Sequence, residues 1–174
     1  KYGDYLLDPD GARDEFLDAY LYSLYFLLKM RRNAGKILVI CITVEFAEKL
    51  RDYTTSVFPY LTTGLFVGSG KNKNDELDRD IVFSTIKSMG TGSEMPNHQS
   101  TINTITYASD VLADQICGRI REQPDGRKGL YIEIVNIAHP VAKSHFDSRE
   151  RILIRKAKDA TIHYHLLNDA DIDQ

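Results

Sequence analysis

Short runs of consecutive apolar residues alternate along the chain with segments whose apolar residues recur every three or four positions. Most of the runs are apolar throughout, which is typical of strands buried on both faces of a parallel sheet. The intervening segments have the spacing of helices that pack against such a sheet. This pattern predicts six strands, at residues 36–42, 62–68, 80–85, 101–109, 129–136 and 161–167.

Four helices are predicted around these strands. The first covers 11–33, and the second begins after Thr43, whose hydroxyl oxygen can cap a helix by accepting a hydrogen bond from its first turn. Two more are predicted at 110–122 and 140–158. Since strands alternate with helices, we predict an α/β fold: a parallel sheet of about six strands with helices on both faces.

The length and composition fit one ordinary globular domain. The chain has 174 residues, of which 43% are hydrophobic and 27% are charged. We predict a linker end at 1–10, a domain at 11–167 and a tail at 168–174. Because the sequence begins with Lys1, we expect it to be a piece of a longer protein.

Charge, cysteines and apolar runs exclude several classes of protein. A net charge of −3 argues against a nucleic-acid-binding protein that is basic throughout, but leaves room for a local basic surface. Cys41 and Cys117 lack the spacing of a zinc site or a disulfide framework. The same cysteine pattern fits a reducing compartment, so we expect an intracellular location. No apolar run is long enough to span a membrane, so we expect no membrane partner.

The stretch TTGLFVGSGKNKND (62–75) looks at first like a phosphate-binding loop. The required pattern is G-x-x-x-x-G-K-[ST], in which backbone N–H groups wrap the phosphates and the hydroxyl binds Mg²⁺. With Gly70 and Lys71 as the G-K pair, Leu65 replaces the first glycine and Asn72 replaces the hydroxyl. We therefore expect a loop at the end of a strand, which either contacts a ligand or is an ordinary exposed turn.

Other polar segments also follow predicted strands. In open parallel sheets, ligands bind beyond the carboxyl ends of the strands, so function should gather along one edge. After 80–85, the backbone around Gly90-Thr91-Gly92 can cradle phosphates or form a flexible turn. In ADQICGRIRE (113–122), helical spacing places Gln115, Gly118 and Arg119 on one face, which is either a site or a solvated surface.

Taken in order, these segments resemble the second RecA-like domain of superfamily 2 helicases and translocases. KILVICITVEFAEKL (36–50) is similar to motif IV, and DIVFSTIKSMGTGSEMPN (80–97) is similar to motif V. QICGRIRE (115–122) is similar to motif VI, whose usual form is Q-x-x-G-R-x-x-R. The resemblance extends from about residue 11 to 165, and the DGRKGLYIEIVN segment that follows motif VI resembles helicases of large DNA viruses and phages.

The resemblance implies a site for ATP and Mg²⁺ between two RecA-like domains. The first domain, N-terminal in the same protein, would hold both cofactors, and the second would supply arginine fingers. Arg119 matches the motif VI arginine, whereas Glu122 replaces the last one and Arg121 precedes it by one residue. The resemblance places three further residues at ATP: Gly92, Glu94 and Gln115.

The resemblance also implies contacts to a nucleic-acid backbone, with DNA favoured over RNA. Four residues at strand ends would hold the phosphates: Thr43, Ser69, Lys71 and Thr85. We expect an ATP-dependent helicase in the full-length protein, in the cytoplasm or at a viral replication or transcription site. Since the chain lacks an intact Walker loop and a D-E-x-[DH] motif, we expect this piece alone to be inactive.

Two other interpretations remain open. The chain is either a RecA-like module that docks nucleic acid or protein without an ATPase role, or an unrelated doubly wound fold with a small-molecule site. His163 and His165 share one face of a predicted strand, but without a third ligand nearby we expect packing or a surface location. A basic run forms either a solvated helix face or part of a nucleic-acid path. This run comprises Arg149, Arg151, Arg155, Lys156 and Lys158.

Overall fold

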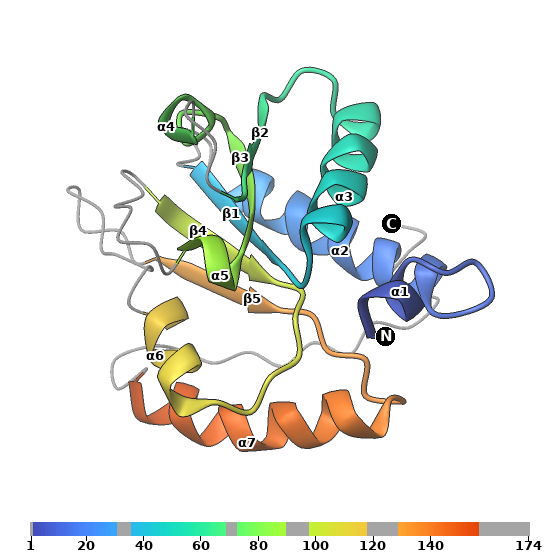
Figure 1. The fold of residues 1–174 in the computed structure, drawn as a ribbon, viewed down its shortest axis with the longest axis vertical. Helices are drawn as coiled ribbons and strands as arrows, with labels where there is room; N and C mark the ends of the chain where they lie inside the picture. The colour runs from blue at the N-terminus through green and yellow to red at the C-terminus, as the bar shows by residue number, and fades with distance from the viewer. Residues whose placement is uncertain (1, 31–35, 69–72, 90–97, 118–128, 157–174) are drawn as a thin grey trace.

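The computed structural model describes residues 2–30, 36–68, 73–89, 98–117 and 129–156 (Figure 1). Helices alternate with strands along most of these residues, as the hydrophobic pattern predicts. The helices are α1 (Tyr2–Leu6), α2 (Arg13–Met30), α3 (Val44–Val57), α4 (Lys73–Glu76), α5 (Ile86–Met89), α6 (Asp110–Cys117) and α7 (Pro140–Lys156). The strands are β1 (Lys36–Cys41), β2 (Thr63–Phe66), β3 (Ile81–Thr85), β4 (His98–Asn103) and β5 (Leu130–Glu133).

The described strands form one sheet in the order β2-β3-β1-β4-β5, and every pair is parallel. The central strand β1 aligns Val39 with Phe83 of β3 on one side and with Ile102 of β4 on the other. This arrangement confirms the predicted α/β fold with a parallel sheet. The sheet has five strands in the described residues, and the sixth predicted strand, at 161–167, lies outside them.

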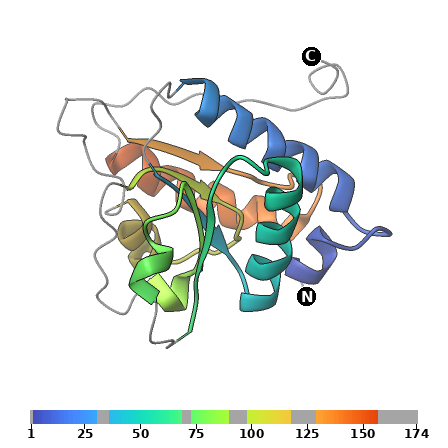
Figure 2. The same cartoon turned by 90° about the horizontal axis from the view of Figure 1, so that it is seen from above.

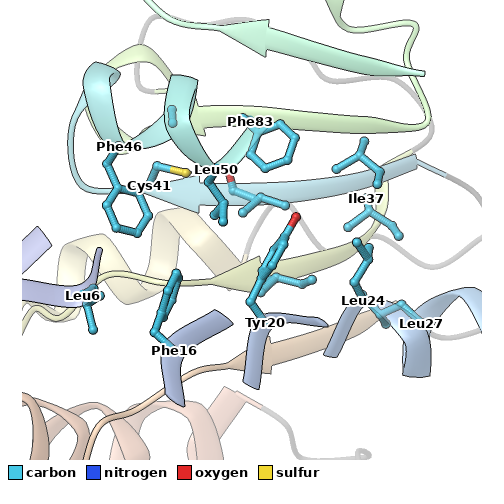
Figure 3. Close-up of a cluster of buried hydrophobic side chains, with 14 of the residues drawn as sticks. Leu6, Phe16, Tyr20, Leu24, Leu27, Ile37, Cys41, Phe46, Leu50 and Phe83 are labelled. Atoms are coloured by element: carbon cyan, nitrogen blue, oxygen red, sulfur yellow. Dashed lines mark hydrogen bonds between the residues drawn. The ribbon is translucent and has the colours of Figure 1, made fainter. Parts of the chain in front are cut away.

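One face of the sheet is covered by α2 and α3 (Figures 1 and 2). Side chains from α2 meet alternate residues of β1 and β3 in a continuous buried cluster (Figure 3). Tyr20 lies fully buried in this cluster, and its hydroxyl is 2.8 Å from that of Thr54 on α3. Thr54 also donates to the carbonyl oxygen of Leu50 at 2.7 Å, so both buried hydroxyls are hydrogen-bonded.

The opposite face is covered by α5, α6 and α7, together with Leu77 just after α4 (Figure 1). Leu38 and Ile40 of β1 point into this second cluster because successive side chains of a strand alternate between faces. Ala113 and Ile116, three positions apart on α6, pack into it, as does Ile152 of α7. Burial on both faces explains why β1 is apolar throughout its length.

Three short helices were not predicted from the hydrophobic pattern. α1 lies inside the segment expected to be a linker end, and its Leu6 is only 3% exposed within the main core. α4 packs over the outer strand β2, where a side-chain carbon placed on Gly64 would lie 2.3 Å from the carbonyl oxygen of Glu76. The Glu76 carboxylate also accepts a hydrogen bond from the N–H of Leu65 at 3.0 Å. α4 therefore protects an edge strand that would otherwise expose its backbone.

Candidate functional site

The carboxyl ends of all five described strands lie along one edge of the sheet, because every pair is parallel. The polar segments that follow β1, β2, β3 and β4 therefore begin at the same edge. This edge is where open α/β sheets bind ligands. We refer to it as the carboxyl edge and describe in turn the side chains that the structure places there.

Thr43 follows β1 and caps α3, as the sequence predicts. Its backbone is extended, with φ −130° and ψ 163°, and its hydroxyl oxygen accepts a hydrogen bond from the N–H of Phe46 at 3.1 Å. The side chain is exposed. A hydroxyl that accepts through one lone pair still has its hydrogen to donate. Thr43 thus presents a donor to solvent beside the positive end of a helix, which favours an anionic ligand.

Thr85 ends β3 and is 6% exposed, with its hydroxyl held by the first turn of α5. Thr85 Oγ1 donates to Ser88 Oγ at 3.0 Å and accepts from the Ser88 N–H at 3.3 Å. Ser88 Oγ also accepts from the N–H of Gly68, the second residue after β2, at 3.1 Å. Gly68 has φ +67°, a conformation that favours glycine. Two loops of the carboxyl edge are therefore joined through buried hydroxyls.

Gln115 lies on α6 and is exposed, while its neighbours Ala113 and Ile116 are buried against the sheet. The helix begins after Ser109, whose hydroxyl oxygen accepts from the N–H of Leu112 at 3.4 Å. The predicted helix face is thus turned away from the core at Gln115. The structure describes α6 only to Cys117, so the rest of the motif VI segment is not placed.

All the other residues predicted at the site lie outside the described part of the chain. The structure therefore tests neither their positions nor their roles. These residues are Ser69, Lys71, Gly92, Glu94, Gly118, Arg119 and Arg121, and the pair His163 and His165 lies outside it as well.

A buried ion pair between α7 and β5 was missed in the sequence. Arg149 donates to a carboxylate oxygen of Glu133, and the two side chains are 1% and 6% exposed. Burial raises the pKa of the Glu133 carboxyl, and the positive charge of Arg149 opposes part of that rise. An acidic residue inside the strand sequence YIEI was the available signal, because a buried carboxylate requires a partner.

The same arginine fixes the segment that leads into α6. Arg149 donates to the carbonyl oxygen of Tyr107, and its guanidinium lies 4.5 Å from the centre of the Tyr107 ring. One helical turn earlier, His145 Nδ1 is 3.1 Å from the hydroxyl of Thr106. α7 therefore anchors the chain between β4 and α6 through two side chains, which sets where α6 begins.

This burial corrects one expectation about the basic run on α7. Arg149 belongs neither to a solvated face nor to a nucleic-acid path, because its charge is paired inside the protein. Arg151 and Arg155 are exposed, as both interpretations of the run required. The exposed part of the run is therefore shorter than the sequence suggested.

The described residues contain no cluster of three or more His, Cys, Asp or Glu side chains placed to hold a metal ion. Within the same part of the chain, every helix is too short or too polar to cross a membrane.

Several solved structures are similar to this chain. It aligns with Mss116p DEAD-box helicase domain 2 bound to an RNA duplex, with 16% identity and a TM-score of 0.60 over 84% of this chain and 65% of that one. It aligns with the E. coli DEAD-box protein SrmB, bound to the regulator RraA, with 16% identity and a TM-score of 0.63 over 87% and 84% of the two chains.

A third similar structure is S. cerevisiae Dbp5 L327V bound to RNA and ADP BeF3. The identity is 16% and the TM-score 0.59, over 78% of this chain and 35% of that one. The fold is RecA-like. The chain spans about two thirds of the Mss116p chain and about a third of the Dbp5 chain. No protein-family model matches the sequence, and no curated protein sequence is significantly similar to it.

Proposed function

We propose that this chain is the second motor domain of an ATP-dependent superfamily 2 helicase or translocase. The observation that supports this most strongly is the agreement between fold and motif order. The parallel sheet places the carboxyl ends of β1, β3 and β4 along one edge, and the motif IV, V and VI segments include or follow these ends in that order; Gln115, the first residue of the motif VI segment, is exposed on α6. A motor of this kind requires those segments to face ATP and nucleic acid together.

In this proposal, Arg119 reaches the phosphates of ATP bound against a first RecA-like domain. There it stabilises the charge that develops on the transferred phosphoryl group, and Arg121 assists it. Gly92, Glu94 and Gln115 contact the nucleotide. ATP and Mg²⁺ are held mainly by the first domain, so this chain completes the site rather than forming it alone.

Nucleic acid lies along the carboxyl edge in the same proposal. Thr43 and Thr85 donate to phosphate oxygens, together with Ser69 and Lys71 from the loop after β2. Such contacts position the strand without selecting its sequence, which suits a motor that steps along any sequence. Similar structures contain RNA, so RNA must be tested beside the DNA that the sequence resemblance favours.

The decisive experiment measures ATP hydrolysis by the full-length protein with and without nucleic acid. Arg119→Ala should lower kcat by about 10³–10⁵-fold, as loss of an arginine finger does. Arg155→Ala, which removes an exposed arginine of α7, is the matched control and should hydrolyse ATP normally in the absence of nucleic acid. Normal turnover in the Arg119 variant would contradict the proposal. The 174-residue chain alone should show no stimulated hydrolysis.

A second candidate function is a RecA-like docking module without an ATPase role. The similarity to SrmB bound to RraA favours it, since that structure holds a protein partner. This function predicts that Arg119→Ala leaves the activity of the full-length protein unchanged. The two candidates therefore give opposite results in the same ATPase assay.

A further inference from the structure

Residues 104–109 connect β4 to α6, and hydrogen bonds hold this connection near both of its ends. At the start, the N–H and the hydroxyl of Thr104 donate to the carbonyl oxygen of Ile40 in β1, at 3.1 and 2.6 Å. Near the end, the carbonyl oxygen of Tyr107 accepts a hydrogen bond from Arg149 of α7. The place at which α6 begins therefore depends on β1 at one side of the connection and on α7 at the other.

Arg149 makes three different contacts through one planar group. Its Nη1 donates to the carbonyl oxygen of Tyr107, its Nη2 donates to the carboxylate of Glu133, and its guanidinium lies 4.5 Å from the centre of the Tyr107 ring. Arg149 is 1% exposed, so water does not compete for these contacts. A rigid guanidinium that holds two acceptors and an aromatic ring at once fixes all three relative to one another. Arg149 therefore joins α7, β5 and the connection to α6 at one buried point.

α6 packs against the same part of the protein. It lies beside α7 (Figure 1), and its buried residues Ala113 and Ile116 belong to the same hydrophobic cluster as Tyr107 and Ile152. Gln115, which lies between these two buried residues in sequence, is exposed. The side of α6 that is buried decides which way the exposed side faces. The contacts that hold Tyr107 therefore also set the direction in which α6 presents Gln115.

We propose that Arg149 is a positioning residue for ATP hydrolysis, because it sets the place of α6 relative to the carboxyl edge. This inference rests on the proposed function, in which the motif VI segment that begins on α6 faces ATP. The guanidinium is engaged inside the protein, so it acts through α6 rather than by contacting ATP. A displacement of about 1 Å at a catalytic group lowers turnover by about 100-fold. Since ATP is held mainly by the first domain, loss of Arg149 should lower kcat and leave the KM for ATP nearly unchanged.

The test separates positioning from stability by removing both charges of the buried pair in the full-length protein. Arg149→Met/Glu133→Leu removes the hydrogen bond to Tyr107 O but leaves no unpaired charge, so this variant should stay folded, as circular dichroism would show. Its kcat for ATP should nevertheless fall about 10- to 100-fold. The matched control is Lys143→Met/Asp147→Leu, which removes an exposed ion pair from the same helix and should leave kcat unchanged. A role in stability alone predicts normal kcat in both folded variants.

A milder change decides the question if the first double variant fails to fold. Thr106→Val removes the hydroxyl that lies 3.1 Å from His145 Nδ1, a second contact between α7 and the connection, and leaves the buried ion pair in place. Its kcat should fall about two- to ten-fold, the range for one lost hydrogen bond, again without a matching change in KM.

Hydrogen exchange in the 174-residue chain gives a readout that does not depend on ATP. The N–H of Ala113 donates to Ser109 O at 3.0 Å and so reports on the first turn of α6. In the Arg149→Met/Glu133→Leu variant this amide should exchange about ten-fold faster or more, because the connection is no longer held near its end. The amide of Val39, in the central strand β1, should keep its wild-type rate.

Three results would overturn the inference. Normal kcat in the folded Arg149→Met/Glu133→Leu variant, or in Thr106→Val if the former does not fold, would remove the role of Arg149 while loss of turnover in Arg119→Ala kept the proposed function intact. An equal loss of kcat in the exposed-pair control would show that the effect is not particular to the buried pair. Normal turnover in Arg119→Ala would overturn the proposed function, and the inference would fail with it.

Discussion

Arg149 on α7 and Glu133 on β5 are 16 residues apart in sequence and form an ion pair that is almost completely buried. The pair anchors a long helix to an outer strand of the described sheet and, through Tyr107, to the segment before α6. Buried pairs of this kind contribute less through their attraction than they cost when one partner is removed.

Arg149→Met should therefore destabilise the chain by about 3–5 kcal/mol at neutral pH, because it leaves a buried carboxylate without its partner. The double variant Arg149→Met/Glu133→Leu should recover much of that loss, since neither charge then remains. Urea denaturation of the two variants measures the difference. A double variant as unstable as the single one would show that packing, rather than charge, sets the loss.

The pH dependence of stability should also reveal Glu133. Its pKa in the folded chain is raised above the ordinary 4.5, so the folded state keeps a proton that the unfolded chain has lost. Stability contributed by Glu133 is therefore greatest in acid and falls as the pH rises above 4.5 through the folded-state pKa. Compared with Glu133→Gln, the wild type should lose stability over this window in denaturation curves. A parallel pair of curves would contradict the raised pKa.

The hydroxyl pair of Tyr20 and Thr54 predicts an asymmetric response to mutation. Tyr20→Phe removes one hydroxyl, but Thr54 still donates to Leu50, so the loss should be about 1 kcal/mol. Thr54→Val leaves the fully buried Tyr20 hydroxyl without this partner and should cost about 1–3 kcal/mol. Thermal unfolding of both variants shows which one loses more stability, and Thr54→Val should lose more. The reverse order would mean that another group satisfies Tyr20.

Gly64 should tolerate no side chain. An added methyl group would meet the backbone of α4 at 2.3 Å, which neither β2 nor α4 can relieve without moving. Gly64→Ala should thus cost about 1–3 kcal/mol, the usual range for overpacking. Gly68→Ala is the comparison, since nothing lies within 4 Å there and only its φ of +67° opposes the change. Gly68→Ala should therefore lower the free energy of unfolding by only about 1 kcal/mol. The difference between the two variants distinguishes the steric collision at Gly64 from the backbone strain at Gly68.

One substitution at Thr43 should change the free energy of unfolding and the binding of nucleic acid in opposite directions. Thr43→Asp keeps a capping oxygen and places a negative charge at the helix N-terminus, so the unfolding free energy should be unchanged or higher. The same charge repels phosphate, so single-strand binding should weaken. Thr43→Ala should lose about 1 kcal/mol through the missing cap. Undiminished binding in the aspartate variant would exclude a phosphate at this position.

Much of the fold could be predicted from the sequence because burial on both faces makes strands apolar throughout. β1 and β3 show this most clearly, since their predicted and observed ranges differ by at most one residue at either end. β4 covers His98–Asn103, whereas the prediction was 101–109: it begins three residues earlier because the polar Ser100 is buried beside β1, and it ends six residues earlier. A polar residue in a buried strand interrupts the apolar run from which such a strand is predicted.

The candidate site was less predictable because its side chains depend on partners far away in sequence. Thr43 acts within its own helix, so its capping role could be predicted and is confirmed. The burial of Arg149 depends on Glu133, which the basic pattern of α7 does not reveal. The engagement of Thr85 by Ser88 is local, but its continuation to Gly68 follows only from strands placed side by side. The roles predicted for Arg119 and the other undescribed residues stay predictions.

The ladder between β1 and β4 gives the carboxyl edge a fixed scale. It is extended past the strands by Thr104, whose N–H and hydroxyl both donate to Ile40 O, at 3.1 and 2.6 Å. β3 and β4 flank β1 in one continuous sheet, so the ends of β3 and β4 are about 10 Å apart, twice the spacing of neighbouring strands. A molecule that contacts the ends of both β3 and β4 must therefore span about 10 Å, which is two strand spacings. Because the sheet fixes this spacing, the chain can change which part of a bound molecule it contacts only by moving as a whole domain.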